Sequence, residues 1–286
     1  MEKNILKRVA SLALAVVMML SVLVVVDPQE VSASEMSIKG SGTQTVKITD
    51  EDLYNEFAAT GTLSDVFIQF KAAKTGYVTF KMTNNSSEVA YTNGYVTLCD
   101  KNKKAISSRD MFQDQDSGAA YNTVTYGVKK GTTYWLKVEL YQLGTTIKAD
   151  FKSQSKSSAN SKKKAKNLGK NKEAKSIMIA NENKADWYKI KLTKSQQLKL
   201  TFNVKTNGTS KYDGVKFSLY KSNGKTLFTS NAYDYISRYY SGKGTVTYYM
   251  SKKGSSKKYG IPKGTYYVKA ERANKTSSGY YTLKWK

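Results

Sequence analysis

The side chains that most often perform catalysis are poorly represented in this sequence. Its 286 residues include no histidine. Without histidine, a Ser–His–Asp or Cys–His nucleophile cannot be assembled, and the commonest general base near neutral pH is missing. Carboxylate chemistry of the glycosidase type needs two facing acids, and no dense acidic motif stands out. We therefore expect a protein that is not an enzyme, with a carboxylate-dependent hydrolase as the less favoured alternative.

Aromatic side chains, which could bind a ligand, are abundant in this sequence. The chain contains 22 Tyr, and several lie close together between residues 233 and 249. Exposed rings offer flat surfaces that pack on sugar rings or on protein chains. Adjacent tyrosines in an extended strand point to opposite faces, so half of such a set is expected in the core instead. The candidate ligand-binding residues are Tyr233, Tyr235, Arg238, Tyr239, Tyr240, Tyr248, Tyr249 and Trp187.

The net charge indicates the kind of partner. Lys and Arg number 47 against 22 Asp and Glu, which gives a formal net charge of +25. Such a charge attracts anionic partners in a salt-dependent manner. Outside a cell these partners would be acidic wall polymers, anionic lipids or acidic glycans, and no motif that recognises nucleic acid is found. The alternative is that the lysines only keep the surface soluble.

The first 33 residues have the pattern of a secretory leader. A basic stretch at residues 3–8 precedes an apolar run over 9–26, and small residues at 31–33 offer a cleavage site before Ser34. We therefore expect residues 1–33 to be a signal peptide. The protein would be secreted or associated with the cell surface, and it would contact a membrane only through the leader. A retained signal anchor is the alternative, because the apolar run is just long enough to span a bilayer.

Short strand-like segments alternate with Gly, Asn, Ser and Lys turns along the rest of the chain, which is typical of all-β sandwiches. Tyr188, Ile190 and Leu192 alternate with Lys189 and Lys191, which predicts one face toward a core and one toward water. The single cysteine cannot form an internal disulfide, and its apolar surroundings predict a buried, unreactive thiol. The fold must therefore be held by its hydrophobic cores.

The two halves of the chain resemble each other. We interpret the resemblance as duplication of one module. The fold expected is therefore two tandem antiparallel β-sandwich modules, jelly-roll-like, at residues 36–152 and 165–286. The small, polar and charged residues 153–164 predict a flexible linker between them. The recurring segments are 64–67 and 185–188, 76–82 and 197–204, 95–103 and 215–224, and 130–138 and 263–270.

Several motifs of the second half carry a family resemblance. They are Ala165-Lys-Asn-Leu168-Gly169, Asp186-Trp187-Tyr188, Leu219-Tyr220 with Asn223-Gly224, Gly264-Thr-Tyr-Tyr-Val268 and Gly279-Tyr-Tyr-Thr-Leu283. In this order they resemble the bacterial pre-peptidase C-terminal domain, a β-sandwich appended to many secreted peptidases and surface proteins. The first half resembles it more faintly. The resemblance implies the fold and a non-catalytic accessory role, including binding of extracellular polymers such as collagen in some members, and it implies no reaction.

Some members of that family bind calcium through acidic residues in the segment that leads into the domain. Here that segment is rich in Ser and Lys. A hard cation needs six or more oxygen ligands, usually with several carboxylates. Turn formation is the alternative role for such residues, because Asp and Asn accept backbone hydrogen bonds in loops. No other cofactor is expected, and the candidate calcium ligands are Asp110, Asp114, Asp116, Asn181, Glu182 and Asp186.

Together these features favour a secreted, non-catalytic binding or adhesion protein. Its partner would be an extracellular polysaccharide, an anionic cell-wall polymer or a fibrous protein, recognised through basic and aromatic surface. A structural or accessory role toward another exported protein is the alternative. Binding that survives high salt would favour the first hypothesis, and co-purification with a defined partner would favour the second.

Overall fold

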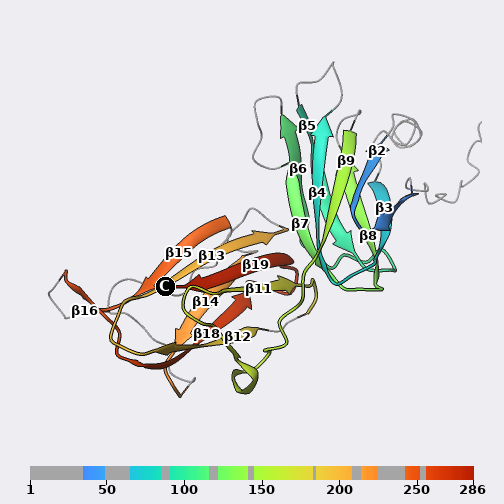
Figure 1. Ribbon diagram of the computed structural model, residues 1–286. Coiled ribbons are helices and arrows are strands. Elements are labelled where there is room, and N and C mark those ends of the chain that lie inside the picture. The colour runs from blue at the N-terminus through green and yellow to red at the C-terminus, as the bar shows by residue number, and fades with distance from the viewer. Residues whose placement is uncertain are drawn as a thin grey trace, which may run out of the picture. The chain divides into compact units, whose positions relative to one another are not determined.

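The computed structural model describes residues 35–48, 65–84, 91–115, 122–140, 145–182, 185–207, 214–223, 242–251 and 256–286. These residues form β-strands and one short 3-10 turn, η1 (Lys162–Lys164) (Figure 1). The prediction of an all-β fold is confirmed. The predicted leader lies outside the described residues, and within the described ranges no helix has the length and apolar character needed to cross a bilayer.

The first set of strands forms two sheets. One has the order β1-β3-β8-β5-β6 and the other has the order β2-β9-β4-β7. The strands are β1 (Glu35–Gly40), β2 (Thr43–Ile48), β3 (Asp65–Ala72), β4 (Gly76–Asn84), β5 (Tyr91–Cys99), β6 (Asp110–Gln115), β7 (Thr123–Val128), β8 (Thr133–Leu140) and β9 (Thr145–Ser153).

The second set also forms two main sheets. Their orders are β10-β12-β18-β14 and β11-β19-β13-β15, and β16 pairs with β17 as a separate two-stranded sheet. The strands are β10 (Lys166–Asn167), β11 (Glu173–Met178), β12 (Asp186–Leu192), β13 (Leu198–Thr206), β14 (Val215–Tyr220), β15 (Gly242–Tyr248), β16 (Met250–Ser251), β17 (Lys258–Tyr259), β18 (Gly264–Arg272) and β19 (Gly279–Trp285).

The two sandwiches share one strand order. The order β1-β3-β8-β5 matches β10-β12-β18-β14, and the order β2-β9-β4-β7 matches β11-β19-β13-β15. Each sandwich also has one parallel pair, β1 with β3 and β10 with β12, at the same edge. The remaining pairs within these sheets are antiparallel, as the sequence predicted. This agreement is what duplication of one module predicts.

Each sandwich encloses its own core. In the first, Phe70 packs on Phe80 with ring centroids 5.8 Å apart, and in the second Phe202 stacks on Phe217 at 5.1 Å. Removing these apolar side chains from water is the main favourable term in folding. Cys99 is buried and unpaired, as predicted, and burial raises the pKa of its thiol to about 11.

Tyrosines are part of both cores. A buried phenol must find a hydrogen-bond partner for its hydroxyl, and those in the cores do. The Tyr248 hydroxyl donates to the carbonyl oxygen of Phe217 at 2.9 Å, and the Tyr248 side chain is 0% exposed. The prediction that Tyr248 binds a ligand is therefore wrong, because its strand turns this ring inward. The buried tyrosines among the described residues are Tyr126, Tyr134, Tyr188, Tyr248, Tyr266 and Tyr281.

Asp186 lies in the core of the second sandwich. The Tyr281 hydroxyl donates to Asp186 Oδ2 at 2.6 Å and lies 2.8 Å from the Tyr188 hydroxyl. Burial raises the pKa of the Asp186 carboxyl above its usual value, against hydrogen bonds from Tyr281 and Ser176 that lower it. The folded protein therefore holds this proton more tightly than the unfolded chain does. The resulting stabilisation is present in acid and is lost as the pH rises through the raised pKa.

Asp186→Asn should become more stable than the wild type as the pH rises. Asparagine keeps an oxygen that can accept from Tyr281, and it has no charge to bury. The difference in unfolding free energy, measured by urea denaturation between about pH 4 and pH 7, should grow with pH. Asp186→Ala removes the acceptor and should cost about 1–3 kcal/mol at the acid end of this range. This cost should shrink as the pH rises, because the titrating carboxyl is absent from this variant too. A pH-independent difference between wild type and Asp186→Asn would contradict this account.

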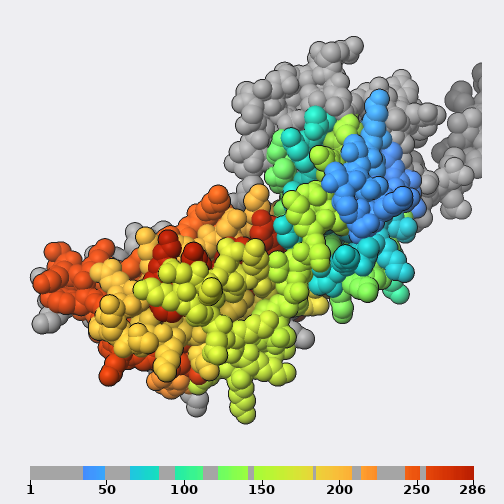
Figure 2. All heavy atoms as spheres, in the orientation of Figure 1, coloured from blue at the N-terminus to red at the C-terminus, as the bar shows by residue number. Residues whose placement is uncertain are grey.

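The segment 153–164, predicted to be a flexible linker, is packed against the second sandwich. Ser157 and Ala159 are buried. The Ser157 N–H donates to Ser176 Oγ at 2.9 Å, and the Trp187 N–H donates to the Ala159 carbonyl oxygen at 2.8 Å. Small side chains let this segment approach the strands closely, so composition alone was misleading. In Figure 2, the yellow-green atoms of this part of the chain lie against the yellow and orange atoms of the second sandwich.

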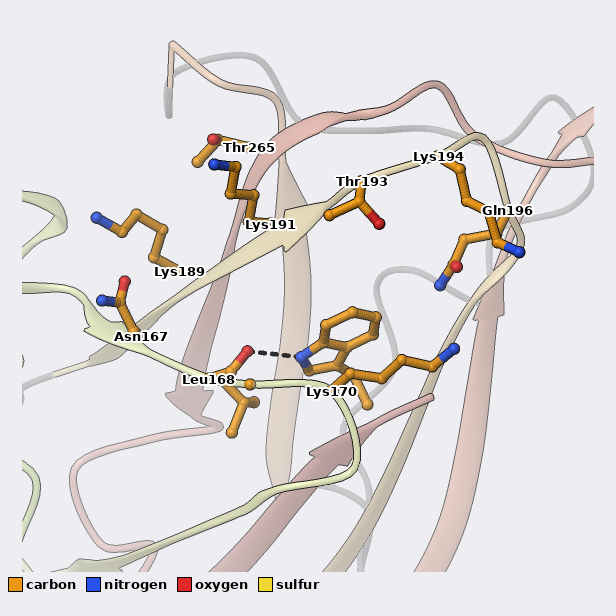
Figure 3. Close-up of a pocket in the computed structure, with 11 residues that line it drawn as sticks. Asn167, Leu168, Lys170, Lys189, Lys191, Thr193, Lys194, Gln196 and Thr265 are labelled. Carbon is orange, nitrogen blue, oxygen red and sulfur yellow. Dashed lines mark hydrogen bonds between the residues drawn. The ribbon is translucent and has the colours of Figure 1, made fainter.

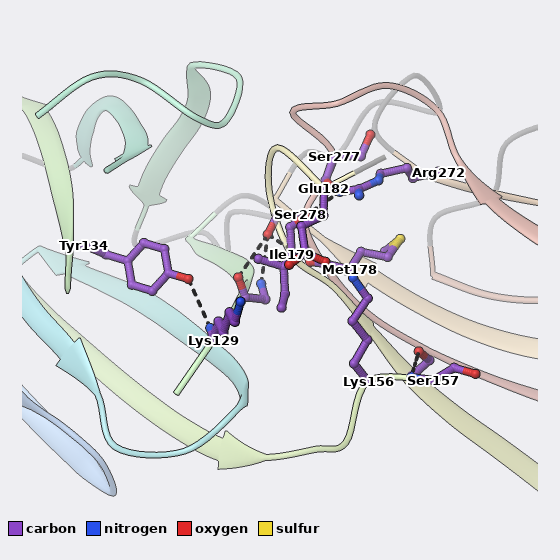
Figure 4. A network of polar contacts seen from close by, with 12 residues as sticks. Lys129, Tyr134, Lys156, Ser157, Met178, Ile179, Glu182, Arg272, Ser277 and Ser278 are labelled. Atoms are coloured by element: carbon purple, nitrogen blue, oxygen red, sulfur yellow. Dashed lines mark hydrogen bonds and ion pairs between the residues drawn. The ribbon is translucent and has the colours of Figure 1, made fainter. Parts of the chain in front are cut away.

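A polar network connects the two sandwiches into one compact unit, Ser34–Lys286 (Figure 4). The Gly127 N–H donates to Ser278 Oγ at 2.9 Å, and that hydroxyl donates to the Met178 carbonyl oxygen at 3.1 Å. Asn207 accepts from the Ser278 N–H at 2.7 Å and donates to Asp110 Oδ2 at 3.0 Å. Asn207 therefore satisfies buried groups from both sandwiches at once.

Asn207→Ala should loosen this connection. The substitution leaves the buried Ser278 N–H and Asp110 carboxylate short of a partner, which costs about 1–3 kcal/mol. We expect a lower melting temperature and earlier exposure of the contact region in hydrogen exchange. Asn203→Ala is the matched control, because Asn203 lies on β13, the strand that ends just before Asn207, with its side chain half-exposed. Equal effects of the two substitutions would contradict the role given to Asn207.

Candidate functional site

A basic pocket lies at one end of the second sandwich (Figure 3). It has a volume of about 650 Å³. Four lysines surround it together with amide and hydroxyl side chains, and we call it the lysine pocket. Its lining residues are Asn167, Leu168, Gly169, Lys170, Lys189, Lys191, Thr193, Lys194, Gln196, Thr265 and Trp285.

Strand β12 positions two of the four lysines. Its residues alternate between buried and accessible, so Lys189 and Lys191 point outward while Tyr188 and Ile190 lie in the core. Both lysines sit opposite residues of β18, and Thr265, which pairs with Lys191, also lines the pocket. The core therefore determines the direction of these two ammonium groups, as the sequence predicted.

The loop after β10 places the third lysine, Lys170. The Leu168 N–H donates to the Lys189 carbonyl oxygen at 2.9 Å, which ties the loop to β12. The Trp285 indole N–H donates to the Leu168 carbonyl oxygen at 2.6 Å, and the Asn171 N–H donates to the Trp285 carbonyl oxygen at 2.8 Å. Trp285 is buried, so a core residue of the opposite sheet anchors this wall of the pocket.

The turn after β12 supplies the fourth lysine, Lys194. Its position is fixed by Gln196, whose N–H donates to the Ile261 carbonyl oxygen at 3.1 Å. The Ile261 N–H returns a bond to the Gln196 carbonyl oxygen at 2.9 Å, and Ile261 is fully buried. Figure 3 shows the labelled lysines arising from β12, from this turn and from the loop of Lys170, with their ammonium groups spread around the hollow.

The pocket is strongly positive. No Asp or Glu is among the described residues that line it. None of its four lysines forms an ion pair with a carboxylate of the described ranges, whereas Lys103, Lys137 and Lys269 elsewhere do. Uncompensated ammonium groups around one hollow attract anions, and the neighbouring amides and hydroxyls can hydrogen-bond to anionic oxygens. The arrangement supports binding of phosphate or carboxylate groups.

Most of the ligand-binding residues predicted from aromatic clustering fall outside the described part of the chain. Tyr233, Tyr235, Arg238, Tyr239 and Tyr240 lie outside the described residues.

Tyr249 and Trp187 are both half-buried and lie in different parts of the second sandwich. Tyr249 follows β15, and the Lys258 ammonium lies 4.8 Å from its ring centroid. Trp187 belongs to β12 and points to the same side as Lys189.

Two of the predicted calcium ligands, Asp110 and Asp186, accept hydrogen bonds from protein side chains. Asp110 is buried and accepts hydrogen bonds from Asn207, Ser108 and Tyr126. Asp186 accepts from Tyr281 in the core, as described above.

The other calcium candidates are also dispersed. Asn181 adopts a left-handed turn conformation with φ of 65°, and Glu182 pairs with Lys156. Asp114 lies on β6, and Asp116 falls outside the described residues. The described part of the chain contains no group of three or more His, Cys, Asp or Glu side chains that could hold a metal ion. Calcium binding stays a prediction.

Comparisons with known proteins give little beyond the fold. The sequence matches no protein-family model. It also matches no curated protein.

Three solved structures illustrate the likenesses found. The pre-peptidase C-terminal domain of a Bacillus anthracis collagenase is 13% identical with a TM-score of 0.28, over 47% of this chain and 100% of that chain. A periplasmic inhibitor of g-type lysozyme from Aeromonas hydrophila is 11% identical with a TM-score of 0.26, over 42% of this chain and 98% of that chain. The CUB1-EGF-CUB2 domains of human MASP-1/3 are 6% identical with a TM-score of 0.23, over 85% and 99%. The resemblance predicted from the sequence is thus found again, and values this low carry no argument about function.

None of the pocket lysines was a predicted site residue. The sequence predicted only the outward direction of Lys189 and Lys191, and it did not single out Lys170, Lys194 or Gln196. They come from loops on either side of β12, and many lysines in this chain have similar neighbours in sequence. The only available signal was the unusual density of lysine. Identifying these particular residues required knowing which lysines lack a carboxylate partner.

Proposed function

We propose that this protein is a non-catalytic binding protein for an anionic polymer outside the cell. The observation that carries the proposal is the lysine pocket, where four lysines line one hollow without a lining carboxylate among the described residues. A phosphate- or carboxylate-bearing chain supplies the opposite charge at repeated positions. An enzyme role has no comparable support, since the lining residues described include no pair of acids and the sequence has no histidine.

Charge magnitudes favour a polymer over a single small anion. Two unit charges about 4 Å apart attract by about 1 kcal/mol in water. One such contact is too weak to hold a ligand, because each tenfold in affinity requires about 1.4 kcal/mol. Several contacts along one chain add through effective concentration. The overall charge of +25 would increase the rate of encounter with the same polymer.

Charge reversal in the pocket should abolish most of this binding. The Lys189→Glu/Lys191→Glu variant should bind polyphosphate and polygalacturonate about tenfold to a hundredfold more weakly, because attraction is replaced by repulsion. The measurement is fluorescence titration at low and high salt. The matched control is Lys199→Glu/Lys205→Glu, which changes the net charge equally at two exposed positions of β13.

Equal losses in the two variants would show that bulk charge, and not the pocket, holds the polymer. Anionic lipid vesicles provide a second arm of the experiment. If vesicles bind with the same dependence on Lys189 and Lys191 while both polymers fail to bind, the assignment to a polymer is wrong.

A further inference from the structure

The outer face of the sheet β10-β12-β18-β14 continues from the lysine pocket into an aromatic surface. Trp187 lies two residues before Lys189 on β12, on the same side of the strand. Lys189 pairs with Tyr267 of the neighbouring strand β18, which in turn pairs with Tyr220 of β14. All three aromatic side chains are half-buried. The pocket and these rings therefore share one sheet face.

Trp187 and Tyr220 meet across the strand that separates them. Their ring centroids are 5.3 Å apart with an interplanar angle of 44°. Their strands, β12 and β14, both pair with β18 and not with each other, so the two rings lean toward each other above it. The Lys269 ammonium lies 5.7 Å from the Trp187 ring centroid, and it pairs with Glu271. We call Trp187 and Tyr220 the aromatic pair.

The indole N–H of Trp187 differs from those of the other two tryptophans. Trp135 donates its indole N–H to the Lys101 carbonyl oxygen at 3.3 Å, and Trp285 donates to the Leu168 carbonyl oxygen at 2.6 Å. Among the described residues, none accepts a hydrogen bond from the Trp187 indole N–H, whose ring contacts are with Tyr220 and Lys269. A half-buried ring with an unused donor can both stack on a ligand and orient it.

The equivalent position of the first sandwich is occupied by Phe67, which is half-buried like Trp187 but is covered by a closer ammonium group. Phe67 faces Lys137 of β8, as Trp187 faces Lys269 of β18. The Lys103 ammonium lies 4.7 Å from the Phe67 ring centroid and forms an ion pair with Glu35. Phenylalanine also offers no donor. The duplicated modules therefore differ at this position in the features a ligand would use.

The spacing suits a chain that runs along β12. Trp187 and Lys191 are separated by four residues, which places them about 13 Å apart along the strand. Ammonium groups at Lys189 and Lys191 thus follow the aromatic pair within the reach of a few units of a polymer.

We propose that the aromatic pair is a stacking subsite for a sugar ring of the same polymer whose charged groups occupy the lysine pocket. The ligand class is then an anionic glycan, since a polymer without sugar rings could use only the pocket. This inference rests on the proposed function. It adds a neutral contact that high salt does not screen.

Two polymers separate the roles of pocket and rings. Polygalacturonate carries sugar rings and carboxylates, whereas polyphosphate carries charge without sugar. Trp187→Leu should weaken binding of polygalacturonate about five- to tenfold at high salt, the usual size of one aromatic stacking contact, and should leave polyphosphate binding unchanged. Phe67→Leu is the matched control, because it makes the same kind of change at the covered position of the first sandwich. Trp187→Phe keeps a ring without the N–H and should lose less affinity than Trp187→Leu.

Each outcome has a distinct meaning. An equal loss for both polymers in Trp187→Leu, or no loss for either, would overturn the stacking subsite while leaving the pocket proposal intact. Failure of the wild-type protein to bind either polymer would overturn the proposed function itself. Should Trp187→Leu fold poorly, Tyr220→Leu removes the other ring of the pair and serves the same comparison.

Discussion

The alternation of side chains along β12 is the constraint on which the rest of this structure depends. One set, Asp186, Tyr188 and Ile190, is committed to the core by burial and by the hydrogen bonds of the Asp186–Tyr281–Tyr188 cluster. Because successive side chains point to opposite faces, the residues between them must face outward. The register of β12 therefore determines both which of its residues form the core and which face the candidate site. A slip by one residue would bury the lysines, which the free energy of ion desolvation forbids.

This constraint explains what could be predicted from the sequence. Alternating apolar and polar residues located the strands, and the same alternation placed Lys189 and Lys191 on the accessible face. It did not decide every case. Of the adjacent pair Tyr248-Tyr249, the pattern predicted one ring inward and one outward, but only the structure shows that Tyr248 is the buried one. The local sequence predicts that side chains alternate between the two faces. The long-range pairing of β15 with β13 determines which of them face the core.

Long-range contacts account for the remaining differences. The segment 153–164 has the composition of a linker, yet Ser157 and Ala159 bond to strands that follow later in the chain. In the comparison of the two halves, Asp65 was aligned with Asp186 because the residues are identical. The structure places Asp65 half-exposed beside Lys137, whereas Asp186 is buried, so the equivalent positions are offset by one residue. Likewise the lysine pocket combines loops that are held by hydrogen bonds to Trp285 and Ile261, distant in sequence, which no local pattern records.

If the anionic polymer binds in the lysine pocket, the bound polymer must shield the four pocket lysines from reagents in solution. The rate at which each lysine of the unmodified protein is acylated can be followed by mass spectrometry, with and without polygalacturonate. The account predicts that Lys170, Lys189, Lys191 and Lys194 are protected together, while the exposed Lys199 and Lys205 react as before. Uniform protection of all these lysines, or protection that omits the pocket, would contradict it.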